Sequence, residues 1–188
     1  MITPPSKPVH STRLLPTLLM TAFFLHSTSG TAAWAQAQAS ALSVDRLVRM
    51  SGPELDALYR QGISVGMPPG RVRGTALLAP GTRRNVALAR GTRLVWQGKV
   101  FEPAEALAVN RFLGLPMIRA QVFQDQSWLD GAPALVLDYS RTSRVYAQYR
   151  DEIRQVAPGL YLGLMYDRTT APPTLKTYFA LETLPPVD

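Results

Sequence analysis

The chain has 188 residues, with 20 lysines and arginines against 13 aspartates and glutamates, and a formal net charge of +7. It contains no cysteine, so a disulfide framework and a thiol nucleophile are both excluded. Its length is sufficient for one domain with a sizeable core.

The first 37 residues have the pattern of a signal peptide. Lys7 and Arg13 supply positive charge, and residues 14–25 (LLPTLLMTAFFL) are apolar but too few to span a bilayer core of about 30 Å as a helix. The sequence Ala35-Gln-Ala37 matches the small-residue pattern of a cleavage site. We therefore predict cleavage after Ala37, with Ala39 as the second choice, and a periplasmic or secreted protein. An uncut N-terminal anchor is the alternative.

Both histidines, His10 and His26, lie inside this predicted signal peptide. The remaining chain of about 150 residues then has neither His nor Cys, which excludes a Ser-His-Asp triad, a Cys-His pair and the usual zinc, copper and haem sites. We expect no metal and no cofactor.

The charge remains basic after cleavage, because the loss of Lys7 and Arg13 leaves 18 basic residues against 13 acidic ones, a net charge of +5. The arginines are scattered, and no basic run is interleaved with aromatic residues. We therefore expect no nucleic-acid partner. A peripheral contact with an anionic envelope surface remains open.

The first predicted elements are helices. Residues 44–50 carry apolar side chains at helical spacing, and we assign residues 38–52 to a linker with this short helix. A second helix is predicted to begin at Ser51, because Ser51 and Glu54 have the spacing of a capping box and Pro53 stands in the first turn. We expect this helix to pack against the body of the domain or to plug one end of it.

The rest of the chain is predicted to be mostly extended. Residues 71–78 alternate as a strand, Thr82 is expected to cap a short helix through residue 89, and a further strand covers residues 94–101. Turn residues separate the other candidate strands. These are residues 107–112, 117–123, 134–139, 144–156, 160–166 and 175–181. Short strands between regular turns predict a mainly β domain with N-terminal helices, built as an antiparallel sheet, sandwich or barrel.

Several motifs resemble the GXWXG family of small lipocalin-like proteins. Residues 70–74 (GRVRG) are followed about 20 residues later by WQGK and Phe101, and the later strands PALVLDY, LGLM and FALE are similar to the domain that usually follows. The signature Trp is Val72 here, so no role is carried over to it. The resemblance covers roughly residues 53–182, with residues 183–188 as a tail. It implies a single antiparallel lipocalin-like, or calycin, barrel with room for an apolar ligand.

A closed barrel of about eight strands has either a packed interior or space for one small ligand. The candidate lining residues are Met117, Phe123, Trp128, Tyr161, Met165 and Phe179, for each of which ordinary core packing is the alternative. Trp96 and Lys99 are further ligand candidates, with Lys99 as a contact for an anion. The alternative for Trp96 is a plug at one barrel end.

Residues 150–154 (RDEIR) pose the sharpest question of orientation. On a strand, Arg150, Glu152 and Arg154 share one face with neighbours about 7 Å apart, and Asp151 lies on the other face. If the three-residue face points outward, it forms an exposed ion-pair ladder worth well under about 1 kcal/mol per pair. If it points inward, the charges must be paired, and an arginine can bind a ligand carboxylate or phosphate.

These observations predict an exported domain that binds a lipid or another apolar or amphipathic small molecule in a barrel cavity. The predicted ligand-binding residues are Trp96, Lys99, Arg150, Glu152 and Arg154. One alternative is an isomerase- or cyclase-type enzyme without His or Cys, in which a buried carboxylate of Glu152 or Asp151 is the general base. Another is an envelope interaction module with a filled core. The discriminating observation is whether Glu152 faces a concave apolar cavity.

Overall fold

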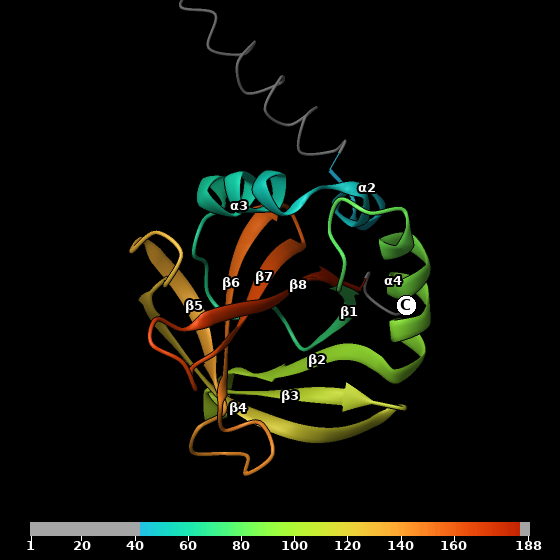
Figure 1. The fold of residues 1–188 in the computed structure, drawn as a ribbon. Helices are drawn as coiled ribbons and strands as arrows, with labels where there is room; N and C mark the ends of the chain where they lie inside the picture. The colour runs from blue at the N-terminus through green and yellow to red at the C-terminus, as the bar shows by residue number, and fades with distance from the viewer. Residues whose placement is uncertain (1–41, 185–188) are drawn as a thin grey trace, which may run out of the picture.

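The computed structural model describes residues 42–184, so the predicted signal peptide and both of its cleavage sites lie outside the described residues. Eight antiparallel strands form a closed barrel in which each strand pairs with the next along the chain, and β8 returns to pair with β1 (Figure 1). The strands are β1 (Arg71–Leu77), β2 (Trp96–Glu102), β3 (Leu107–Phe112), β4 (Leu115–Gln126), β5 (Pro133–Asp138), β6 (Tyr149–Ala157), β7 (Leu160–Asp167) and β8 (Thr174–Thr183). The mainly β, single-domain barrel predicted from the sequence is confirmed.

In the described part of the chain, three α-helices pack on the outside of the barrel: α2 (Val44–Arg49), α3 (Gly52–Gln61) and α4 (Arg84–Val95). A 3-10 turn, η1 (Pro103–Glu105), links β2 to β3. The predicted capping box starts α3, since Glu54 Oε2 accepts hydrogen bonds of 2.7 Å from both the backbone N and the Oγ of Ser51. Within residues 42–184, no helix is both long enough and apolar enough to cross a membrane.

The apolar core has two parts on opposite sides of the barrel wall. The interior cluster receives side chains from all eight strands, among them Val72, Leu137, Ile153 and Phe179. The second cluster lies between the helices and the outer face of the wall, where Leu55 and Tyr59 of α3 meet side chains of β7 and β8 (Figure 1). Strands β6–β8 are therefore covered on both faces, and this explains the nearly continuous burial of β6 and β7 and of residues 178–181 in β8.

The structure corrects three boundaries predicted from the sequence. Helix α4 continues through Gly91 to Val95, so residues 94 and 95 are helical and β2 starts at Trp96. Tertiary contacts carry the helix past the glycine, since Ala89 is buried and Arg93 Nε donates to Thr75 Oγ1 of β1 at 2.8 Å. Residues 144–148 form turns, and β6 begins at Tyr149. Thr82 does not cap α4, because its hydroxyl donates to the Ala79 carbonyl instead.

Candidate functional site

The barrel interior contains a cavity of about 220 Å³, and most of its wall is apolar. Its wall includes Leu78 and Val95, which are themselves solvent-exposed and mark its mouth beside the C-terminal part of α4. The complete set of lining residues is Ala76, Leu78, Thr92, Val95, Trp96, Lys99, Asn110, Phe112, Tyr139, Tyr146, Asp151, Met165, Thr177 and Phe179.

Two glycines make room for the aromatic wall of this cavity. A Cβ added at Gly74 would lie 2.7 Å from the Trp96 ring, and a Cβ at Gly163 would overlap the Phe179 ring. The two rings meet edge to face, with centroids 5.7 Å apart. The missing side chains of Gly74 and Gly163 thus let the Trp96 and Phe179 rings sit directly against the barrel wall.

A buried polar cluster occupies the inner wall of the cavity, with Lys99 at its centre. Lys99 Nζ donates three hydrogen bonds, to Asn110 Oδ1 at 2.8 Å, to Tyr139 OH at 2.8 Å and to Asp151 Oδ2 at 2.9 Å. An ammonium group has three N–H donors, so every donor of Lys99 has a partner. The Trp96, Tyr139 and Phe179 rings also lie 5.3–5.5 Å from Nζ, within cation–π range.

The neighbours of Lys99 are bonded to one another as well. Tyr139 OH donates to Asp151 Oδ2 at 2.7 Å and accepts from Asn110 Nδ2 at 3.0 Å. Asn110 Nδ2 also donates to the Ile118 carbonyl at 3.3 Å, and Asn110 Oδ1 accepts from Trp96 Nε1 at 3.0 Å. The cluster therefore holds its members in a fixed arrangement inside an apolar wall.

One atom of this cluster has no hydrogen-bond partner within residues 42–184. Asp151 is 3% exposed and lines the cavity, and its Oδ1 atom is buried without a bond, whereas Oδ2 accepts from both Lys99 and Tyr139. A buried carboxylate oxygen without a donor is costly. Asp151 Oδ1 is consequently a buried, unpaired acceptor on a residue of the cavity wall.

Burial changes the protonation behaviour of the cluster. Loss of hydration lowers the pKa of Lys99, and the Asp151 carboxylate opposes that shift. Burial raises the pKa of Tyr139 well above its ordinary value, and the nearby charge of Asp151 adds to the increase. Tyr139 is therefore a neutral hydrogen-bond donor at ordinary pH.

The three-residue face of RDEIR points out of the barrel, yet it is buried. Arg150, Glu152 and Arg154 are 6%, 0% and 2% exposed. Glu152 accepts hydrogen bonds from Ser127 Oγ at 2.5 Å and from the Trp128 backbone N at 2.9 Å. Burial raises the pKa of Glu152, while these hydrogen bonds act in the opposite direction. The expectation of an exposed ion-pair ladder is wrong, because the β4–β5 connection covers this face.

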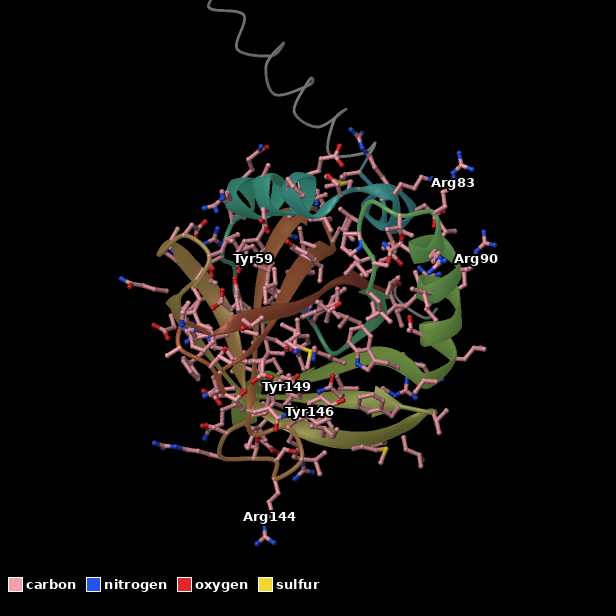
Figure 2. All side chains as sticks on the ribbon, viewed as in Figure 1. Tyr59, Arg83, Arg90, Arg144, Tyr146 and Tyr149 are labelled. Carbon is pink, nitrogen blue, oxygen red and sulfur yellow. The ribbon has the colours of Figure 1, made fainter. Side chains whose placement is uncertain are left out.

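The two arginines hold the covering segments in place. Arg154 forms a forked pair with Asp130, with both N···O distances 2.7 Å, and its Nη1 donates to the Tyr59 carbonyl of α3 at 3.2 Å. Arg150 Nε lies 3.2 Å from Glu152 Oε1, and its guanidinium carbon lies 4.4 Å from the Trp128 ring centroid. Figure 2 shows Tyr59 between α3 and the barrel wall. These contacts tie the β4–β5 connection and α3 to β6.

The structure therefore brings only part of the predicted site together. Trp96 and Lys99 line the cavity, whereas Arg150, Glu152 and Arg154 do not. None of these three residues contacts the cavity, so a ligand role for them stays a prediction. The enzyme hypothesis required Glu152 to face a concave apolar cavity, and Glu152 does not line this one. Met165 and Phe179 line the cavity, Tyr161 belongs to the interior core, and Met117, Phe123 and Trp128 are exposed. Asn110 and Tyr139 also line the cavity, and neither was predicted to do so from the sequence.

A crystal structure of a protein from Thermomonospora curvata is similar to this chain, with a TM-score of 0.52 and 16% sequence identity. The similarity covers 80% of this chain and 99% of the other. It shows the fold alone. No family model matches the chain, and no curated protein matches it.

Proposed function

We propose that the protein is an exported lipocalin-like carrier that binds a neutral, mostly apolar small molecule through one hydrogen-bond donor. The observation that supports this most directly is Asp151 Oδ1, a buried acceptor without a partner in the wall of an apolar cavity. A hydroxyl, amide or similar N–H or O–H group on the ligand would satisfy this oxygen.

The cavity volume favours a small ligand or one end of a larger one. A dry apolar cavity of about 150 Å³ accommodates benzene, whereas sites for drug-sized ligands span about 300–1,000 Å³. The cavity of this barrel, at about 220 Å³, lies between these limits and is open at its mouth. A ring system or a short acyl chain fits this range.

The charges of the cluster favour a neutral ligand. Lys99 and Asp151 form an ion pair at 2.9 Å, with 2% and 5% of their side chains exposed, so their charges offset each other within the wall. All three donors of Lys99 are already engaged. An acidic ligand head would have to break one of these bonds, and the anion contact predicted for Lys99 therefore has no free donor to use.

Two naphthalene ligands of nearly equal size test the role of the donor. 2-Naphthol carries an O–H group, and 2-fluoronaphthalene does not. We expect 2-naphthol to bind at least about tenfold more tightly, because a hydrogen bond to a charged group contributes about 1.5–3 kcal/mol. Titration calorimetry measures both affinities. Equal affinities would exclude the proposed role of Asp151 Oδ1.

A cavity-filling variant tests whether binding occurs inside the barrel. Ala76 lines the cavity, whereas Ala87 is exposed on α4. We expect Ala76→Leu to lower the affinity for 2-naphthol and Ala87→Leu to leave it unchanged. Native mass spectrometry of the protein purified from its host is the companion measurement. If no small molecule co-purifies and neither naphthalene binds, the carrier proposal fails, and the envelope interaction module replaces it.

The carboxylate in the cavity also supports a second candidate function, an acid–base enzyme of the isomerase or cyclase type. The sequence suggested Glu152 or Asp151 as the base, and Asp151 is the one of the two that lines the cavity; the neutral Tyr139 is a candidate proton donor. Molecules that co-purify with the wild type and with Asp151→Asn separate the two functions. A carrier yields the same molecule from both proteins, in a smaller amount from the variant because the hydrogen bond to the carboxylate is weakened. An enzyme without its base instead accumulates an unconverted substrate of different chromatographic behaviour.

Export and membership of the GXWXG family are separate parts of this proposal. Intact-mass measurement of the protein recovered from the periplasm or the culture medium tests export, because cleavage after Ala37 or Ala39 gives distinct masses. Retention of the full-length chain inside the cell would contradict export. The lipocalin-like assignment is supported by the closed eight-stranded barrel, by the resemblance of residues 70–74 and by the WQGK segment that follows.

A further inference from the structure

An apolar edge stands out on the surface beside the cavity mouth. Its five side chains are between 52% and 74% exposed, and they come from the C-terminal end of α4, the β3–β4 turn and the first residues of β4. They are Leu94, Val95, Leu113, Leu115 and Met117. Figure 1 shows that the end of α4 and the β3–β4 turn meet at one corner of the barrel. A group of large apolar side chains exposed together usually marks an interaction surface.

The backbone holds this apolar edge together. The Leu113 N–H donates to the Val95 carbonyl at 2.8 Å, and Leu115 pairs with Phe112 across the turn. Leu113 has a φ of 49°, in the left-handed region that costs a residue with a side chain about 1–2 kcal/mol. Asn or Gly would suit that position better. An exposed leucine at a strained position therefore lowers stability and gains no burial within this chain.

Four arginines lie next to the apolar edge. Arg71 and Arg73 of β1, Arg93 of α4 and Arg111 of β3 surround a shallow depression of about 490 Å³. No carboxylate lines it within residues 42–184. The one ion pair in this group joins Arg73 to Glu182 at 3.7 Å between exposed side chains, which is a weak contact.

The depression and the apolar edge are continuous. Arg111 Nη2 donates to the carbonyl of Gly114 at 2.8 Å, so the tip of the β3–β4 turn borders the arginines. On the helix, Arg93 immediately precedes Leu94. Val95 belongs to both the apolar edge and the cavity wall. Positive charge, exposed leucines and the cavity mouth therefore share one corner of the barrel.

We propose that this corner docks on the surface of an anionic lipid bilayer. The leucines enter the interfacial region, and the arginines bind lipid phosphates, which a guanidinium recognises with paired N–H groups. A two-fold contact between copies of this chain fits less well, because it brings the same arginines face to face. Docking here points the cavity mouth at the membrane, but the surface itself functions without any ligand in the barrel.

Vesicle binding by the protein expressed as the full chain tests this proposal, with the same N-terminus throughout the variant series. Vesicles of phosphatidylcholine with about one third phosphatidylglycerol are compared with pure phosphatidylcholine, at low and high salt. Arg71→Gln with Arg73→Gln removes two charges from the depression. The matched control is Arg83→Gln with Arg90→Gln, two exposed arginines that point away from the barrel on the outer side of α4 in Figure 2.

We expect binding to require phosphatidylglycerol and to weaken with salt. The Arg71/Arg73 double variant should lower the partition coefficient by roughly 25-fold, since each arginine near an anionic surface contributes about fivefold. The control pair should change it by less than about threefold, because its charges lie away from the docked surface. Equal losses in both pairs would indicate general charge attraction and overturn the proposal.

A second pair of variants tests the leucines. Leu94→Gln with Leu113→Asn should lower vesicle binding by at least about tenfold, because each buried apolar side chain adds to interfacial affinity. The control is Ile63→Gln with Val145→Asn, whose native side chains are exposed to a similar degree elsewhere. Unchanged vesicle binding in the leucine pair would overturn the proposal. So would a wild-type dimer that this pair converts to monomer without any vesicle binding.

Discussion

The buried Lys99–Asp151 pair gives a prediction that can be worked out from the structure. Lys99→Met and Asp151→Asn each remove one charge and leave the other uncompensated inside the barrel. At 2.9 Å and an effective dielectric of about 20, the Coulomb attraction is about 6 kcal/mol. Much of this is offset by the hydration that both groups lose, and breaking such a pair costs about 3–5 kcal/mol. We expect each single variant to lose that much stability.

The double variant Lys99→Met/Asp151→Asn should lose far less than the sum of the two. It leaves no unpaired charge in this cluster, because both charged groups are replaced. Asn110 Oδ1 keeps its bond from Trp96, and residue 151 keeps its bond from Tyr139. Its expected cost is about 2–4 kcal/mol for the three lost bonds of Lys99, at about 1 kcal/mol each. Subtracting this cost from the summed costs of the single variants gives a coupling energy of about 2–8 kcal/mol, or about 5 kcal/mol at the midpoints.

Urea-induced unfolding measures these free energies, and thermal melts provide a second readout. A loss of 3–5 kcal/mol corresponds to roughly 10–15 °C in Tm for a domain of this size. Destabilised single variants are measured at reduced temperature. Single-variant costs that add up to the double-variant cost within about 0.5 kcal/mol would refute the reasoning, because independent sites behave in that way.

The Asp151→Asn variant should also have a distinct pH profile. Burial lowers the pKa of Lys99, and the Asp151 carboxylate is the group that opposes this shift. Without the carboxylate the folded-state pKa falls further, whereas the unfolded chain keeps a value near 10.5. Between the two values the unfolded state binds more protons, so stability rises with pH. We expect a steeper rise than in the wild type, and a flatter profile would contradict the assignment.

Two further predictions concern the cavity wall and the outer face. Gly163→Ala should destabilise the protein by about 1–3 kcal/mol and weaken 2-naphthol binding, because the new Cβ displaces the Phe179 ring; Gly91→Ala, with open space around it, is the control and should be neutral or stabilising. Hydrogen bonds from Arg154 lower the pKa of Asp130 in the folded protein. The Arg154–Asp130 pair therefore contributes its full stability above about pH 3.8, and this contribution is lost as the pH falls through the lowered pKa. Asp130→Asn should therefore be less stable than the wild type at neutral pH, and that difference should vanish in acid, as urea unfolding at several pH values would show.

The sequence predicted correctly those elements whose determining contacts lie within a few residues of one another. The Ser51–Glu54 capping box needs only its own turn, and β7 was predicted from a short apolar run that follows the Pro158-Gly159 turn. The boundary at Gly91 failed because packing of α4 on β1 overrides the low helix propensity of glycine.

The orientation of RDEIR could be predicted only in part. Alternation correctly placed Arg150, Glu152 and Arg154 on one face, opposite Asp151. It could not show that Ser127, at the end of β4, and α3 would cover that face, because those segments are distant in sequence. The charges consequently lie on the outer face of the barrel and are still buried. The two predicted alternatives, a face inside the barrel and a face exposed to solvent, did not include this arrangement.

The cavity cluster carried a sequence signal that was not used. In LAVNRF, Asn110 shares a strand face with Ala108 and Phe112, and in PALVLDY, Tyr139 follows the buried positions Leu135 and Leu137. A polar group on an otherwise apolar face must find a partner across the interior. The sequence does not show which residues pair with one another, because the members of the cluster are far apart along the chain: Lys99, Asn110, Tyr139 and Asp151.

The pairing of β1 with β8 determines when the barrel can close during folding. Val72 pairs with Thr183, so the wall closes only after the last strand of the described chain is available. Contacts between residues so distant in sequence slow folding. If the predicted signal peptide directs the chain across a membrane unfolded, this delay is an advantage, because no barrel can close before the C-terminal strand has crossed.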